Sequence, residues 1–117
     1  MPPKVDQKND FIRVRHMVDA IQEALSFVKG KTRMALERDR MLALSLIKEI
    51  EIIGEAASKI SGAFQKTYPH IAWAEIVEIR NRLIHGYFDV DLNILWNTVI
   101  KDLPPLVKDL KRILKTK

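Results

Sequence analysis

The sequence contains no cysteine among its 117 residues. This absence excludes disulfides, thiolate zinc sites, iron–sulfur clusters and cysteine nucleophiles. Four glycines and five prolines mark few turns, which disfavours a β fold with many hairpins. No apolar run reaches the ~20 residues of a membrane span, and the N-terminal residues lack the apolar core of a secretory signal. We therefore expect one cytoplasmic domain over residues 1–117, not bound to a membrane, with frayed ends at 1–8 and 115–117.

Apolar side chains recur every three or four residues, the spacing of one helical face. The first run extends from Phe11 to Val28, and Gly30 is expected to end that helix. A second helix is expected to begin within 32–35 and to end near 61–62. The small residues of its 54–57 stretch favour a close crossing with a neighbouring helix.

Two further helices are expected after Pro69 interrupts the pattern. One begins near Ala72 and ends at Gly86, and the next begins at Asp91, a residue type that caps helix N-termini well. Pro104 and Pro105 remove two backbone donors and are expected to break the last helix. The sequence therefore predicts an all-α fold, a four- to five-helix up-and-down bundle broken at 104–105.

The net charge of +5 comes mainly from two segments. Residues 29–40 carry five basic side chains against two acidic ones, and residues 101–117 carry six against two. Such clusters attract the phosphates of RNA or DNA. They are equally compatible with a solubilising helical surface, and charge alone does not decide between the two.

Most motifs of known chemistry are missing, since the sequence has no Gly-rich phosphate loop, no zinc-binding His-Glu-x-x-His and no Gly-x-Ser-x-Gly. One dense polar cluster is present, comprising Arg80, Asn81, His85 and Tyr87. On a helix, Asn81 and His85 lie one turn apart on the same face. An imidazole moves protons near neutral pH, and a guanidinium binds phosphate oxygens and stabilises added negative charge. The cluster therefore fits phosphodiester chemistry.

A structural role for the same residues is the alternative. His85 would then donate to a backbone carbonyl, and Arg80 would pair with Glu78 or Asp89 on the surface. An Arg and a His five residues apart do not distinguish these readings by themselves.

The wider pattern resembles the HepT-like branch of the HEPN superfamily. The motif of that superfamily is Arg, a polar residue and a His a few positions later, and this branch adds a Tyr two residues beyond the His. Arg80, Asn81, His85 and Tyr87 match it. Further matches run through nearly the whole chain and comprise 15–17 with Glu23 and Phe27, then 53–57, 71–73, Trp96 and 103–104.

The resemblance implies a homodimeric toxin of a toxin–antitoxin module, a metal-independent endoribonuclease that needs no cofactor. The ribose 2′-OH of the RNA substrate would attack its own phosphodiester. Arg80 would then stabilise the phosphorane, His85 would transfer the proton and Asn81 would order the site. Tyr87 would lie at the site mouth, where a nucleotidyltransferase antitoxin attaches AMP.

Three points stay open at the level of the sequence. A non-catalytic nucleotide- or nucleic-acid-binding module that acts through a nucleotidyltransferase partner is an alternative function, and a purely structural helical dimer is another. The second acid–base group that cleavage needs is either His85 of a second copy or Tyr87. Apolar positions beyond those needed for a core are available for a dimer surface, namely Leu44, Ile52, Ile84 and Ile100.

Overall fold

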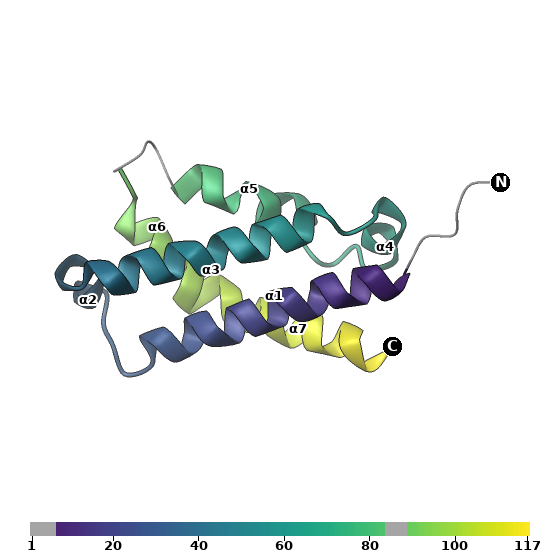
Figure 1. The fold of residues 1–117 in the computed structure, drawn as a ribbon, viewed down its shortest axis with the longest axis horizontal. Coiled ribbons are helices and arrows are strands. Elements are labelled where there is room, and N and C mark those ends of the chain that lie inside the picture. Colours follow the sequence, from purple (N-terminus) through teal and green to yellow (C-terminus); the bar gives the residue numbers. More distant parts are fainter. Residues whose placement is uncertain (1–6, 84–88) are drawn as a thin grey trace.

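The structure, a computed structural model, describes residues 7–83 and 89–117. The elements in chain order are α1 (Gln7–Val28), α2 (Met34–Arg38), α3 (Arg40–Ser58), α4 (Gly62–Thr67), α5 (Trp73–Leu83), α6 (Leu92–Asn97), the π-helical turn η1 (Thr98–Asp102) and α7 (Leu103–Lys115). In Figure 1 the long helices alternate in direction, with α3 packed between α1 and α5, and α7 packed on α1. The all-α bundle predicted from the sequence is confirmed.

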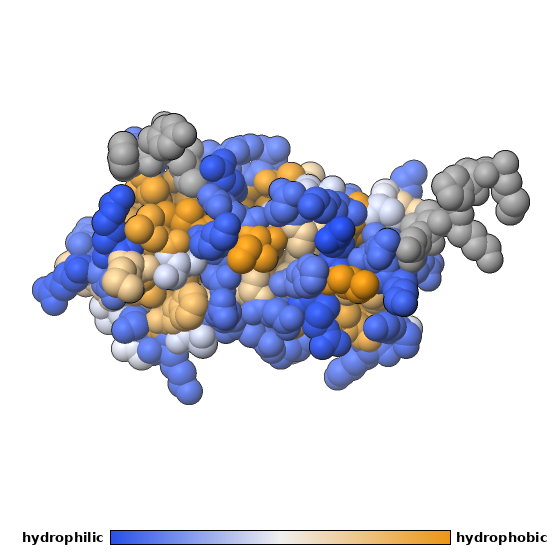
Figure 2. Space-filling model, viewed as in Figure 1, coloured by the Kyte–Doolittle hydropathy of each residue, from blue (hydrophilic) through white to orange (hydrophobic). Residues whose placement is uncertain are grey.

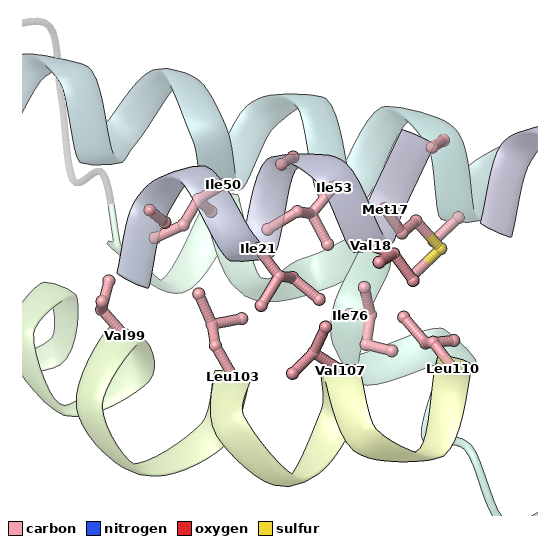
Figure 3. Close-up of a cluster of buried hydrophobic side chains, with 14 of the residues drawn as sticks. Met17, Val18, Ile21, Ile50, Ile53, Ile76, Val99, Leu103, Val107 and Leu110 are labelled. Atoms are coloured by element: carbon pink, nitrogen blue, oxygen red, sulfur yellow. The ribbon is translucent and has the colours of Figure 1, made fainter. Parts of the chain in front are cut away.

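The core lies where α1, α3 and α7 face one another, with α5 closing it on the side of α3. Figure 3 shows apolar side chains from these helices and from η1 meeting in one cluster. The labelled members are Met17, Val18, Ile21, Ile50, Ile53, Ile76, Val99, Leu103, Val107 and Leu110. Their burial removes apolar surface from water, which is the main force that holds the helices together.

The prediction of a single helix from 32–35 to 61–62 is wrong, because the helix is interrupted at Asp39. The backbone of Asp39 is extended, with φ −125° and ψ 94°, and its side chain accepts a hydrogen bond from Leu42 N at 3.1 Å. This cap starts α3 as a new helix after the short α2. Helix α4 was not predicted, and Ser61 caps it by accepting from Phe64 N at 3.2 Å.

Two other predicted boundaries are confirmed. Helix α1 ends at Val28, before Gly30, whose φ of 75° favours glycine. The Asp91 side chain caps α6 through Asn93 N and Ile94 N, both at 3.0 Å. The break predicted at 104–105 lies earlier in the chain: the π-helical turn η1 interrupts the α-helix at 98–102, and both prolines lie in the first turn of α7, where a missing backbone donor is tolerated. The expected end at Gly86 lies outside the described residues.

Two close contacts fix how the helices sit on one another. A Cβ added to Gly54 of α3 would lie 3.5 Å from Ile76 O of α5, so the predicted close crossing is confirmed. The buried carboxylate of Asp10 accepts hydrogen bonds from Ser61 N at 2.8 Å and from Ser61 Oγ at 2.7 Å. This joins the start of α1 to the start of α4 and satisfies polar groups that would be costly to bury unpaired.

A second buried carboxyl group lies in α3. Glu49 is only 4% exposed, and Glu23 of α1 hydrogen-bonds to it. Within the described parts of the chain, no helix is both long and apolar enough to cross a membrane.

Candidate active site

The helix that carries the predicted site, α5, is anchored at both ends. At its start Trp73 is buried and its indole Nε1 donates to Tyr68 O at 3.0 Å. At its end Leu83 is fully buried, and its carbonyl accepts a hydrogen bond from Asp91 N at 3.1 Å. Arg80 lies between these anchors in the last turn of α5. Both ends of the helix that carries Arg80 are therefore anchored, while its side chain reaches solvent.

The guanidinium of Arg80 is held by a carboxylate from another helix. Arg80 Nε lies 3.2 Å from Glu51 Oε1 of α3, and the side chains are 51% and 33% exposed. Such an exposed pair contributes little to stability, on the order of 0–1 kcal/mol. Its effect here is geometric, because it orients the guanidinium while occupying Nε, one of the five N–H donors.

Asn81 has a different partner. Its amide Nδ2 donates to Glu78 Oε2 at 3.0 Å, one turn earlier in α5. Glu78 therefore binds Asn81, whereas Arg80 pairs with Glu51. The alternative in which Arg80 pairs with Glu78 or Asp89 is not observed among residues 7–83 and 89–117. His85 and Tyr87 lie outside the described residues.

A groove of about 520 Å³ opens beside Arg80. Helices α1, α3 and α5 line it, and α3 supplies most of the lining. Its members are Arg13, His16, Lys48, Glu51, Ile52, Gly54, Glu55, Ala56, Ser58, Lys59, Val77 and Arg80. Eight of the twelve lining residues are polar or charged and alternate with apolar surface, so the groove presents charged groups to a ligand.

Arg82, two residues further along α5, lies in a separate groove of about 420 Å³ between α5 and α7, floored by α3 residues such as Ile50 and Ile53. Arg80 and Arg82 therefore line two different grooves. In the described ranges 7–83 and 89–117, no three His, Asp or Glu side chains gather in a way that could hold a metal ion.

Glu51 is the site residue that sequence reasoning missed. It precedes Arg80 by 29 positions, and its neighbours in the sequence are apolar. A carboxylate inside a strongly apolar helix was the available signal, because such a charge needs a partner or solvent. Nothing in the sequence indicated which cation would meet it.

Comparison with known proteins agrees with the resemblance seen in the sequence. A family model described as "Ribonuclease HepT-like" matches residues 17–113. The chain belongs to the HepT-like ribonuclease family. The expected enzyme class, a ribonuclease, is the class of this family.

Individual relatives support this assignment. A Thermococcus cleftensis protein named "Probable ribonuclease HepT" is 34% identical over 102 residues, covering 84% of this chain and 93% of that protein. A Caldanaerobacter subterraneus protein named as a candidate RNase is 32% identical over 102 residues, covering 87% and 91%.

A Methanocaldococcus jannaschii protein is 35% identical over 109 residues. Its name combines gamma-glutamylcyclotransferase with a candidate RNase. The match covers 93% of this chain but 49% of that protein, so the chain spans about half of that relative's length. No solved structure was found to match the chain.

Proposed function

We propose that this HepT-like protein is a metal-independent endoribonuclease that cleaves RNA by attack of a ribose 2′-OH on the adjacent phosphodiester. The observation that carries the proposal is Arg80, which lines a groove with charged residues and whose guanidinium is held by Glu51. Family membership adds the reaction class, and His85 follows Arg80 by five residues.

Each proposed role follows from the chemistry of the side chain. Arg80 binds two oxygens of the scissile phosphate and stabilises the phosphorane charge. His85 transfers a proton, a role that suits an imidazole near neutral pH. Asn81 orders the site from the adjacent position in α5, where Glu78 already fixes its amide.

A homodimer completes the chemistry in this proposal. Cleavage needs one group to deprotonate the 2′-OH and another to protonate the leaving 5′-oxygen, and His85 of a second copy supplies the second group. Leu44 and Ile100 are 51% and 39% exposed and are available for a dimer surface. Ile52, also expected there and 36% exposed, lines the groove beside Arg80. Figure 2 shows apolar patches within the hydrophilic face that α1 and α3 share. Ile84, also expected in this surface, lies outside the described residues.

The proposed activity is tested by cleavage of labelled single-stranded RNA in EDTA. We expect the wild type to produce fragments with 2′,3′-cyclic phosphate and free 5′-OH ends, and the double variant Arg80→Ala/His85→Ala to produce none. Equal cleavage by both proteins would reveal a contaminating nuclease. RNA or nucleotide binding without cleavage by the wild type would favour the non-catalytic binding module.

The toxin role and its control by a nucleotidyltransferase antitoxin are also part of the proposal. AMP on Tyr87 would add bulk and negative charge at the site mouth, which would repel RNA phosphates. Mass spectrometry after co-expression with a genomically adjacent nucleotidyltransferase is expected to find AMP on Tyr87. Tyr68 is the matched control, since it is the other tyrosine of the chain. Equal modification of a Tyr87→Phe variant would refute the assignment.

A further inference from the structure

The groove beside Arg80 contains more positive charge than its own carboxylates neutralise. Two ion pairs occupy both acidic residues of the lining. Arg80 pairs with Glu51, and Lys59 pairs with Glu55, each at 3.2 Å. The carboxylates of the groove are therefore already compensated before any ligand binds.

Arg13 of α1 and Lys48 of α3 line the same groove and have no ion-pair partner among residues 7–83 and 89–117. Lys48 is exposed and Arg13 is half-buried. His16, one turn of α1 beyond Arg13, lines the groove as well. Two uncompensated cations in one groove attract a polyanion and release its counterions on binding.

We infer that this groove holds the RNA strand that flanks the cleaved phosphate, with Arg13 and Lys48 neutralising phosphates beyond the one that Arg80 contacts. The inference rests on the proposed function, because it takes the cleaved strand as the ligand. The two residues that would contact the RNA, Arg13 of α1 and Lys48 of α3, lie outside the Arg80–His85 motif.

The lining also predicts how the strand is recognised. Proteins that bind single strands usually stack bases on aromatic rings, with about 1–3 kcal/mol per base. Among the described residues that line the groove there is no Phe, Tyr or Trp. Binding here therefore depends on the sugar-phosphate backbone, and it shows strong salt dependence and weak base preference.

The test uses a fully 2′-O-methylated single strand, which cannot undergo 2′-OH attack, and measures Kd by fluorescence anisotropy from 50 to 200 mM salt. The groove variant is Arg13→Gln/Lys48→Gln, which keeps polar side chains but removes both charges. The matched control is Lys108→Gln/Lys111→Gln in α7, two exposed lysines outside the groove. Circular dichroism melts confirm that each variant is folded.

We expect the groove variant to bind about tenfold more weakly at 0.1 M salt. The slope of log K against log salt concentration is expected to become shallower by about 1.4, because each of the two lost phosphate contacts contributes about 0.7 on a single strand. The control is expected to keep the wild-type slope, and strands of different base composition are expected to bind alike. An unchanged groove variant, or an equal loss in the α7 control, would overturn the inference.

A parallel cleavage assay with unmodified RNA separates this inference from the proposed function. If the wild type cleaves RNA and the groove variant binds the strand normally, RNA binding in the groove is refuted and the ribonuclease proposal stands. If the groove variant loses binding but the wild type does not cleave, RNA binding in the groove is supported and the ribonuclease proposal is refuted.

Discussion

Replacing Arg80 with Ala is expected to lower kcat/KM for RNA cleavage about 100- to 1,000-fold, the usual loss when one donor to a developing oxyanion is removed. Arg80 lines the groove and its Nε is held by Glu51, so its terminal nitrogens are oriented without further reorganisation. Arg80→Lys is expected to recover a minor part of the activity. A lysine keeps the charge but loses the planar fork that binds two phosphate oxygens.

Arg82 provides the matched control for this prediction. It is exposed in the same helical turn of α5 but lines the groove between α5 and α7. Initial rates measured under the same conditions are expected to differ less than threefold between Arg82→Ala and the wild type. Equal losses in the two alanine variants would show that the helix end, and not the guanidinium of Arg80, is what activity requires.

A double-mutant cycle separates catalysis by Arg80 from positioning by Glu51. Because Glu51 acts through the guanidinium, Glu51→Ala is expected to lower the rate in the wild type but not in the Arg80→Ala background. Glu51→Gln is expected to retain more activity than Glu51→Ala, since the amide oxygen still accepts from Nε. Additive losses in the cycle would contradict this positioning role.

The fold was largely predictable because its boundaries depend on local chemistry. Gly30 and Asp91 lie at helix ends where their own backbone or side chain favours the observed geometry. Asp39 was missed although it is an equally good cap, because the apolar spacing continues across it and favoured one long helix. A periodic pattern reports which face is buried, and it does not report a one-residue interruption.

The sequence indicated only the part of the candidate site that is contiguous in the chain. Arg80 and Asn81 were proposed because their spacing to His85 forms a motif in a short stretch of sequence, and the structure places both of them in α5. Glu51 and Arg13 reach the same groove from α3 and α1, and their positions depend on how those helices pack. Such convergence is a tertiary property, so it could be found only from the folded chain.

The buried carboxyl group of Glu49 gives the fold a pH-dependent stability. The pKa of Glu49 is raised from 4.5 to about 7. Burial is the largest cause, and a hydrogen bond with Glu23 and repulsion from the charge of Glu23 raise the pKa further. Glu49 Oε2 has no hydrogen-bond partner among residues 7–83 and 89–117, so ionisation would leave a buried negative charge without compensation.

The direction of the effect follows from proton binding. Between about pH 4.5 and 7 the folded chain keeps the proton on Glu49, whereas the unfolded chain releases it. The free energy of unfolding therefore falls as the pH rises through this window, by up to about 1.4 kcal/mol per unit. Below it, both states carry the proton and the contribution of Glu49 is constant.

Replacing Glu49 with Gln removes the ionisation and keeps the shape and a hydrogen-bonding amide. The variant is expected to be more stable than the wild type by about 1–3 kcal/mol at pH 8 and to differ little at pH 4.5. Urea unfolding at a series of pH values measures both numbers. Glu55→Gln, also in α3 but exposed and paired with Lys59, is the control and is expected to stay within about 0.5 kcal/mol of the wild type at each pH. A Glu49→Gln variant whose unfolding free energy tracks the wild type from pH 5 to 8 would show that this carboxyl group does not hold a proton in the folded protein.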